Sequence, residues 1–168
     1  MLIRPARFDD IEDIHSLLTY YANQGALLPR SRESLTAHLS QLAVAYAGGI
    51  IGGVAALHRL DSQVGEVRSL AVAPHLHKKG IGQKLVLYAV SQAELLGYQK
   101  VIAFTRQVSF FERCGFQPVA RETVPVKYFL DCAGCPMLTH CDEIAMERAL
   151  LIPLPEQNRV EYPASLTK

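Results

Sequence analysis

The chain has 168 residues, which is the length of one ordinary domain. Its 49% apolar and 20% charged content is typical of a folded globular protein and argues against wholesale disorder. The 17 basic and 16 acidic side chains are interspersed and give a formal net charge of +1. Proteins dedicated to nucleic acids or membrane surfaces usually carry a basic excess, so we expect neither as a partner.

The first ten residues contain Pro5, Asp9 and Asp10 before any apolar run accumulates, which is unlike a secretory signal peptide. The longest apolar stretch covers residues 42–57 and is interrupted by Gly48-Gly49 and Gly52-Gly53. This predicts two strands joined by a Gly-Gly turn, because both central positions of that turn need a positive φ. We expect a cytoplasmic protein whose thiols stay reduced.

The first 60 residues predict a strand, two helices and a hairpin. After a strand at residues 2–6, Asp9 is expected to cap a helix, with Glu12 completing a capping box and Gly25 ending the segment. The apolar stripe of this helix consists of Ile11, Ile14, Leu18 and Tyr21. A second helix is expected to begin at Ser31, and the hairpin strands are expected at residues 44–47 and 51–60. One face of that second helix carries Leu35, Leu39 and Leu42.

The rest of the chain predicts a strand–helix–strand unit and two further strands. A strand at residues 66–72 ends before Pro74, and a long helix follows at residues 80–96. A strand at 101–105, a short helix at 108–113 and strands at 116–119 and 144–150 complete the pattern. This order predicts a mixed α/β sheet with one right-handed crossover. We expect one domain at residues 1–150, with a Cys-rich turn at 131–142, and a Pro-containing tail at 151–168.

The sharpest local signal is the segment from Leu70 to Gly82, LAVAPHLHKKGIG, in which a buried strand runs into a basic, Gly-containing loop and then a helix. The first N–H groups of a helix have no intrahelical acceptor and lie at its positive end. Glycines at positions 80 and 82 leave room for a close approach, so the segment predicts an anion site, most naturally for phosphate. A tight connection with solvated lysines would use the same residues.

This segment resembles the signature of the GNAT acetyltransferase superfamily, which is a strand ending in V-x-P followed by [QR]-x-x-G-x-[GA] at a helix start. The matching residues are Val72-Ala73-Pro74 and His77 to Gly82, although His77 stands where Gln or Arg is usual. The segment from Ser109 to Phe116, SFFERCGF, is similar to the family's F-[FY]-x-x-x-G-F ending. The resemblance implies an α/β fold with a mostly antiparallel central sheet, helices on both faces and a splayed strand pair that binds acetyl-CoA.

The same resemblance implies where acetyl-CoA binds. Its pyrophosphate would contact the loop N–H groups, and its pantetheine arm would pair with the end of the preceding strand like an added strand. The residues assigned to the cofactor in this way are Leu70, Ala71, Val72, His77, Lys78, Lys79, Gly80, Ile81, Gly82 and Phe111.

A narrower resemblance, to N-acetylglutamate synthases, appears at residues 25–35 (GALLPRSRESL), at residues 65–72 (GEVRSLAV) and at residues 123–127 with the Cys-rich turn after them. It implies L-glutamate as the acceptor, in arginine biosynthesis, with Arg30, Arg32, Ser69 and Lys127 as substrate-binding residues. Guanidinium groups fit carboxylates in both geometry and charge. Three alternatives stay open: a helix start with solvated charges, another acceptor (an amino acid, a polyamine or a protein N-terminus), and a non-catalytic acyl-CoA-sensing module.

Direct attack of an amine on a thioester needs a base, donors for the developing oxyanion and a proton for the thiolate. Glu66 is the candidate base, through water, although an exposed strand carboxylate would look the same. The N–H of Ala71 or Val72 is the expected oxyanion donor. Phe111 stands where many family members carry a Tyr, so we take Tyr128 as the candidate acid, with Thr105 and Ser109 as the other nearby hydroxyls.

Three of the four cysteines lie between Cys132 and Cys141, as Cys132-Ala133-Gly134-Cys135 and then His140-Cys141. A C-x-x-C pair is typical of tetrahedral zinc, so Cys132, Cys135 and Cys141 are candidate ligands of a structural zinc ion. Adjacent His140 and Cys141 fit such a site poorly, and reduced thiols packing a turn or a redox role remain alternatives. A homodimer is also left open.

Overall fold

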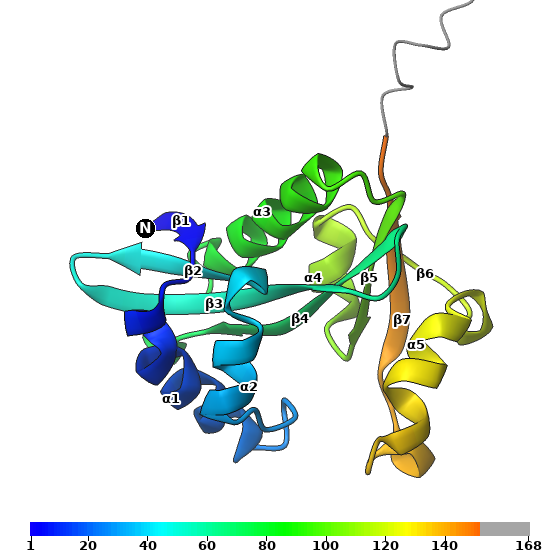
Figure 1. Ribbon diagram of the computed structural model, residues 1–168, viewed down its shortest axis with the longest axis horizontal. Helices are drawn as coiled ribbons and strands as arrows, with labels where there is room; N and C mark the ends of the chain where they lie inside the picture. The colour runs from blue at the N-terminus through cyan, green and yellow to red at the C-terminus, as the bar shows by residue number, and fades with distance from the viewer. Residues whose placement is uncertain (152–168) are drawn as a thin grey trace, which may run out of the picture.

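The computed structural model describes residues 1–151, apart from the side chains of Tyr128 and Phe129, so the predicted tail beyond Leu151 lies outside it. Within that range one seven-stranded sheet runs in the order β1-β2-β3-β4-β5-β7-β6 (Figure 1). Only the β4–β5 pair is parallel, so the predicted mixed, mostly antiparallel sheet is confirmed. The strands are β1 (Leu2–Pro5), β2 (Leu42–Ala47), β3 (Ile50–Arg59), β4 (Val64–Val72), β5 (Lys100–Thr105), β6 (Gln117–Pro118) and β7 (Ile144–Ala149).

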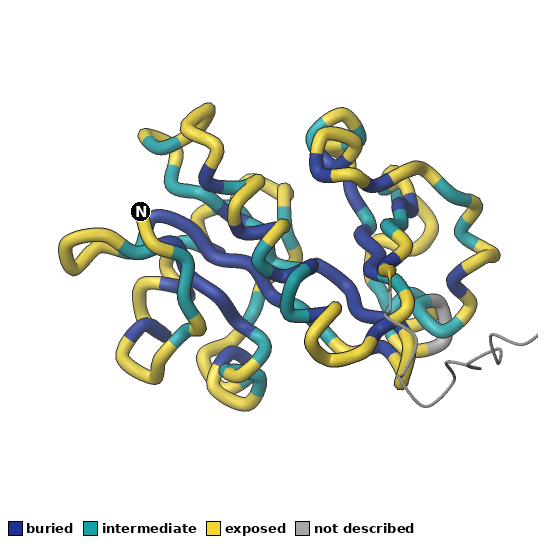
Figure 2. Tube along the Cα trace, turned by 90° about the horizontal axis from the view of Figure 1, so that it is seen from above, coloured by how far each residue is buried: buried dark blue, intermediate teal, exposed yellow. Residues whose placement is uncertain are grey.

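Helices cover both faces of this sheet. On one face α1 (Ile11–Ala22) and α2 (Arg32–Ala37) pack through Ile14, Leu18 and Leu35 against β2, β3 and β4. On the other face α3 (Ile81–Leu95) and α4 (Val108–Arg113) pack against the remaining apolar side chains. Figure 2 shows the buried strands running through the middle of the molecule between exposed helix surfaces and loops. Every helix within residues 1–151 is too short or too polar to span a lipid bilayer.

Two local expectations were wrong, and one helix was not predicted. Leu39 and Leu42 are not on the second helix, because α2 ends at Ala37; Leu39 begins a separate 3-10 turn, and Leu42 begins β2, where it pairs with Ala56 of β3. Asp9 does not cap α1, since a 3-10 turn at Phe8–Asp10 precedes the helix and the Asp10 carboxylate accepts the Arg7 N–H at 2.7 Å. A helix, α5 (Pro125–Leu130), also forms where none was predicted, with Pro at a first-turn position that suits it.

Two departures from regular pairing open the sheet at its centre. β4 and β5 pair only from Val64 to Glu66, after which the remainder of β5 pairs with β7 alone. β4 also has a bulge opposite Ala55 of β3, where Ser69 adopts a φ of +49°. The two parallel strands therefore separate beyond Glu66, as the predicted splayed pair requires.

Candidate active site

A cavity of about 670 Å³ lies where β4 and β5 separate. Its wall is built from the end of β4, the loop that follows, the first turn of α3, the end of β5 and α4. Of the sequence-predicted cofactor residues, the ones that line it are Leu70, Val72, His77, Lys78, Gly80, Ile81, Gly82 and Phe111. The structure thus gathers most of the motif around one concave surface, while Ala71 packs under it, against α1, and Lys79 is exposed beside it.

The N-terminus of α3 points its unpaired N–H groups at this cavity. Gly80 is the N-cap residue with a φ of +74°, a conformation that side chains other than glycine's rarely adopt. The first helical hydrogen bond is donated by Lys84 to the Gly80 carbonyl, so the N–H groups of Ile81, Gly82 and Gln83 have no acceptor earlier in the helix. A Cβ added at Gly82 would lie 3.4 Å from the Phe110 ring. The glycine leaves that space open for a ligand.

The end of β4 presents backbone groups to the cavity. Ala73 donates its N–H to the Gly52 carbonyl, and antiparallel pairs alternate, so Ala71 faces β3 whereas Val72 faces the cleft. Of the two oxyanion donors expected from the sequence, the geometry therefore favours Val72. The Val72 carbonyl accepts a 2.5 Å hydrogen bond from the Tyr21 hydroxyl and lies 2.9 Å from Nε2 of His77. His77 is thus placed at the strand end, 2.7 Å from the same hydroxyl.

Phe111 and Cys114 line the cavity but are packed in the core beneath it. Phe111 is buried and makes edge-to-face contacts with Phe110 and Phe116, each with ring centroids 5.2 Å apart. The Cys114 thiol is buried too, and its burial raises its pKa, which keeps it in the neutral form. This cysteine therefore belongs to the packed core.

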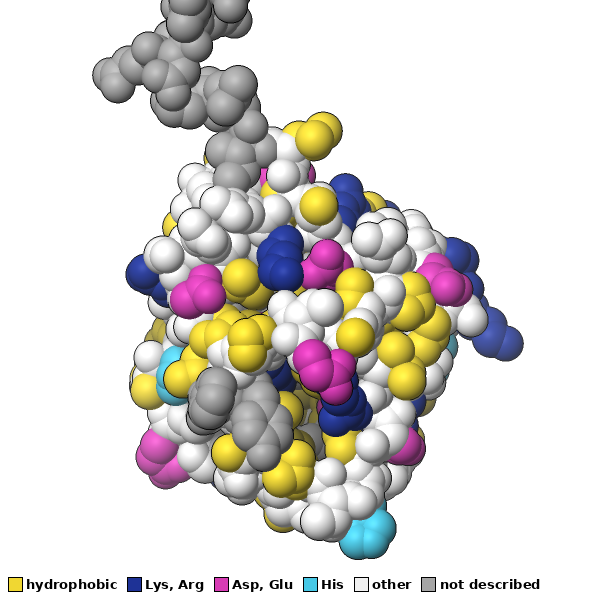
Figure 3. Space-filling model, turned by 90° about the vertical axis from the view of Figure 1, so that its right-hand side faces the viewer, with side chains coloured by type: hydrophobic (Ala, Val, Ile, Leu, Met, Phe, Trp, Pro, Cys, Tyr) yellow, Lys and Arg dark blue, Asp and Glu magenta, His cyan; other side chains and the backbone are white. Residues whose placement is uncertain are grey.

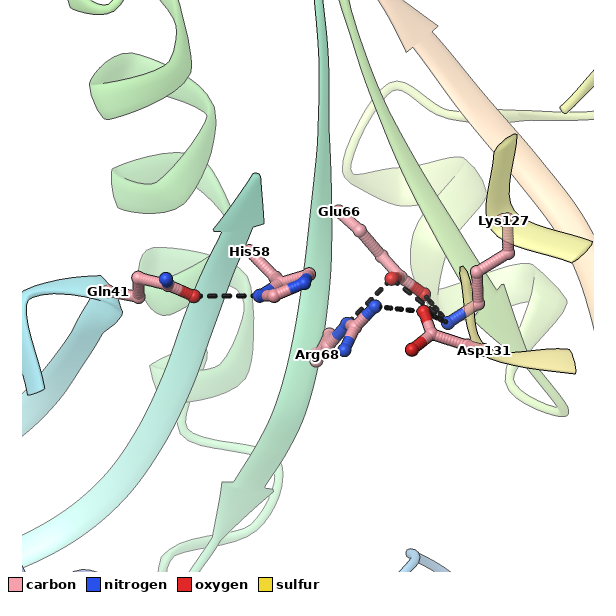
Figure 4. Close-up of polar contacts among 6 residues, drawn as sticks. All are labelled: Gln41, His58, Glu66, Arg68, Lys127 and Asp131. Atoms are coloured by element: carbon pink, nitrogen blue, oxygen red, sulfur yellow. Dashed lines mark hydrogen bonds and ion pairs between the residues drawn. The ribbon is translucent and has the colours of Figure 1, made fainter. Parts of the chain in front are cut away.

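Beside the cavity, two carboxylates and two cations form a compact group that we call the charged cluster: Glu66, Arg68, Lys127 and Asp131 (Figure 4). Glu66 is buried on β4, and its oxygens lie 2.6 Å from Arg68 Nε and 2.8 Å from Lys127 Nζ. Asp131 follows α5; its Oδ2 lies 3.0 Å from Lys127 Nζ and also accepts a hydrogen bond from Arg68. Arg68 is the member of the cluster that lines the cavity.

The pKa values of Asp131 and of two side chains near the charged cluster, Arg30 and His58, are shifted from their ordinary values. Burial works against ionisation of Asp131, but Lys127 and Arg68 outweigh it and hold the pKa of this carboxyl below its usual range. Arg30 donates to the Ser34 hydroxyl at 3.1 Å and 3.3 Å, and burial together with the charge of Arg68 lowers its pKa. Burial, reinforced by Arg68, lowers the pKa of His58 to about 4, and its Nδ1 lies 2.8 Å from Gln41 (Figure 4).

The predicted acceptor residues are only partly brought together. Arg30 and Lys127 both lie within electrostatic reach of Arg68 or Asp131, and Ser69 lines the cavity. Arg32 instead pairs with Glu12 of α1 at 2.7 Å on the outer surface, with half of its side chain exposed. Tyr128, the candidate acid, lies on α5, and its side chain is outside the described residues.

The cysteine segment gives the zinc prediction no support. Among residues 1–151, leaving aside the two undescribed side chains, no three His, Cys, Asp or Glu side chains come together in a way that would hold a metal ion. Cys141 Sγ instead accepts a hydrogen bond from the Arg121 guanidinium at 3.3 Å, and burial raises the pKa of the Cys132 thiol. Without such a group of ligands, the zinc assignment of Cys132, Cys135 and Cys141 has no support in the described residues.

Three residues of the site had no role in the sequence-based prediction: Tyr21, Arg68 and Asp131. Arg68 follows Glu66 by two residues, which places both side chains on one face of a strand. Asp131 follows Lys127 by four residues, the spacing of neighbours on a helix. Those two signals were present in the sequence. Tyr21 belongs to the apolar stripe of α1, and nothing local distinguishes it from a core residue.

Figure 3 shows the side of the molecule that carries α5 and β7, where cationic, anionic and hydrophobic side chains alternate over the surface. On this side of the molecule the positive charges are scattered among other side chains and form no broad basic patch.

Comparison with known proteins agrees with this geometry. A family model described as an acetyltransferase (GNAT) domain matches residues 38–118. An uncharacterised N-acetyltransferase of Chlorobaculum tepidum is 35% identical over 148 residues, which cover 88% of this chain and 96% of that protein. The amino-acid acetyltransferase of Neisseria meningitidis is 33% identical over 125 residues, or 73% of this chain. The match covers only 29% of that longer relative.

Two solved structures, both in complex with coenzyme A, have a similar fold. Rv2747 of Mycobacterium tuberculosis, in complex with CoA and NLQ, has a TM-score of 0.79 and 28% identity, covering 90% of this chain and all of that one. The N-acetylglutamate synthase of Neisseria gonorrhoeae, complexed with coenzyme A and N-acetyl-glutamate, has a TM-score of 0.77 and 27% identity, covering 89% of this chain and 35% of that one. With a match over nearly the full length of a relative, and with the splayed strands and helix start that the sequence predicted, the chain belongs to the GNAT acetyltransferase family and is an acyltransferase.

Proposed function

We propose that this enzyme transfers the acetyl group of acetyl-CoA to the α-amino group of L-glutamate, in arginine biosynthesis, by direct attack of the amine. The donor follows from the family and from relatives whose structures hold CoA. The acceptor is supported by the similarity to amino-acid acetyltransferases and by the cations that converge beside the cavity.

On the donor side, the backbone N–H groups from Lys79 to Gly82 would hold the pyrophosphate, with the ammonium groups of Lys78 and Lys79 adding charge. The cleft-facing edge of Leu70 and Val72 would pair with the pantetheine arm. The residues fit this role because the open space at Gly82 lies between the start of α3, the end of β4 and Phe110. Acetyl-CoA supplies the activated acetyl thioester.

The observation that carries the acceptor assignment is the state of Arg30. Its guanidinium is half-buried and close to the like charge of Arg68, and these two effects outweigh the nearby Asp131 carboxylate and disfavour the charged form. Among the described residues, its hydrogen bonds go to the Ser34 hydroxyl and no carboxylate forms an ion pair with it. An acceptor carboxylate bound here would offset both penalties. A dicarboxylic amino acid could use Arg30 for one carboxylate and the charged cluster for the other.

The remaining steps involve protons and the developing negative charge. We propose that the N–H of Val72 stabilises the thioester oxygen as charge develops there. Glu66 would accept the ammonium proton through water, while its contacts to Arg68 and Lys127 hold these cations in place. Tyr128 stays our candidate for protonating the departing thiolate.

Thiol release from acetyl-CoA, measured with and without glutamate, tests the proposal. Glutamate should stimulate release, whereas polyamines and peptide N-termini should not. Arg30→Ala should raise the glutamate KM about tenfold or more, as expected for loss of a charge-assisted hydrogen bond, and leave the acetyl-CoA KM unchanged. Arg59→Ala, at an exposed arginine at the end of β3, is the matched control. Release that no amino acid stimulates would refute the proposal.

A further inference from the structure

Arg68 and Lys127 are each bound by two carboxylates, and these two carboxylates differ in how firmly the fold holds them. Glu66 lies on a central strand with 4% of its side chain exposed. Asp131 lies just beyond the end of α5 with 34% exposed. Figure 4 shows the two approaching the cations from different elements, Glu66 from β4 and Asp131 from the segment after α5. One partner is held in the core, and the other is partly exposed to solvent at a helix end.

We propose that Asp131 occupies the position on Arg68 and Lys127 that a carboxylate of the acceptor takes during catalysis, and that the acceptor binds by displacing it. The inference rests on the proposed function for the identity of the acceptor. It adds a specificity-determining residue to the site.

Charge balance supports an exchange over a simple addition. Arg68 and Lys127 already face two carboxylates, so a further carboxylate on these two cations would leave three anions on two cations; Arg30, which lies nearby, is assigned to the other carboxylate of the acceptor. If the acceptor replaces Asp131, the balance is kept and the hydrogen-bond donors of Arg68 and Lys127 stay satisfied. Asp131 then turns toward solvent, to which a third of its side chain is already exposed.

The packing of this segment allows Asp131 to leave while Lys127 stays. Val124 is buried, and Val126 packs with it against Ile102 and the other apolar residues beneath this segment, which fixes the start of α5 on the sheet. Lys127 Nζ also lies 5.6 Å from the Phe104 ring centroid. Asp131 is joined to α5 by its N–H bond to the Lys127 carbonyl at 3.0 Å, at the last turn of the helix. Helix ends open more readily than helix centres.

The exchange selects acceptors by their carboxylate. An amine that lacks a carboxylate cannot form ion pairs with Arg68 and Lys127. It therefore cannot displace Asp131 and does not bind. An amino acid with a side-chain carboxylate can replace Asp131 in kind. Asp131 therefore weakens the binding of every acceptor, but it excludes simple amines most strongly.

Asp131→Asn tests the inference, because the amide keeps the size of the side chain and removes its charge. Glutarate, which has two carboxylates and no amine, is titrated into the protein saturated with CoA, so that binding is read without turnover. Removing an internal competitor raises the fraction of open sites, and we expect the glutarate Kd and the glutamate KM to fall roughly tenfold. The acetyl-CoA KM should not change. Glu122→Gln, at an exposed carboxylate of the turn before α5, is the matched control.

An unchanged or higher glutarate Kd in Asp131→Asn would overturn the inference, since Asp131 would then be neutral or would help to position the cations. Asp131→Ser is measured in parallel so that a folding defect of one variant is recognised by its unfolding curve. The two proposals fail separately. If the wild-type enzyme does not acetylate glutamate, the proposed function is wrong, whereas the glutarate titration still decides the role of Asp131.

Discussion

Gly82→Ala separates the role of the α3 N-terminus in folding from its role in binding. Gly82 lies in the first turn of α3, and a Cβ there would meet the Phe110 ring at 3.4 Å and Val72 Cγ2 at 3.6 Å, which are ordinary van der Waals distances. Its φ is not among the positive values of this chain. The methyl group therefore fits the folded protein, but it occupies the space through which a phosphate would approach the N–H groups.

The expected effects on stability and on binding have opposite signs. Alanine is favoured over glycine in a helix by about 0.5–1 kcal/mol, which corresponds to a rise in Tm of roughly 1–4 °C for a chain of this size. Displacing a phosphate from the helix start loses charge-assisted hydrogen bonds of about 1.5–3 kcal/mol each. This predicts a CoA affinity roughly 10- to 100-fold weaker. The glutamate KM, measured at saturating acetyl-CoA, should change little.

Calorimetric titration with CoA and thermal unfolding measure the two effects on the same protein. Gly80→Ala is the contrasting variant: its added Cβ meets nothing within 4 Å, but the φ of +74° makes the residue strained, so stability should fall by about 1–2 kcal/mol. If Gly82→Ala binds CoA with the affinity of the wild type, the phosphate does not lie at the start of α3, and the assignment of the loop is wrong.

Two further predictions concern charged and titratable groups. Glu66→Gln keeps an oxygen for Arg68 and removes the charge. If Glu66 accepts the ammonium proton, kcat should fall by about 10²- to 10⁴-fold with a similar glutamate KM. A rise in KM alone would mean that Glu66 is only a positioning residue. In the folded protein burial lowers the pKa of His58 from its ordinary 6.5 to about 4, so the unfolded chain binds a proton at this residue first as the pH falls. Stability should therefore decrease from pH 6.5 to 4, by at most about 3 kcal/mol, and urea unfolding of His58→Gln should lack this part of the pH dependence. Equal pH dependence in both proteins would contradict the assignment.

The donor side of the site was predictable because its residues are neighbours in the chain. The segment from Leu70 to Gly82 brings strand, loop and helix start together within 13 residues, and the glycine at position 80 has the positive φ that its place at the helix start requires. Hydrophobic periodicity likewise placed α3 and β4 close to their observed bounds. Local sequence determines such features, since the interactions that form them span only a few residues.

Hydrophobic periodicity predicted the wrong element where a strand distant in the sequence offers backbone hydrogen bonds. Leu42 continues the apolar face of α2 in the sequence, yet it forms part of β2, because the backbone hydrogen bonds offered by β3 outweigh another helical turn. The splay of β4 and β5 has no local signal either. It arises because β7 binds the far edge of β5 up to Thr105 while α1, α3 and the bulge at Ser69 hold β4 on β3.

The composition and motifs by themselves established a near-neutral chain and the chemistry of an acetyltransferase, and they predict a phosphate site at the start of α3. Only the tertiary structure decided how the charges are paired. Glu66 and Lys127 are 61 residues apart in the chain, Arg68 and Asp131 are 63 apart, and all four meet in one partly buried cluster. Two cations with two carboxylates look like solvated charges in a sequence. Folding brings these charges together and buries Glu66, so which of them pair is decided only in the tertiary structure.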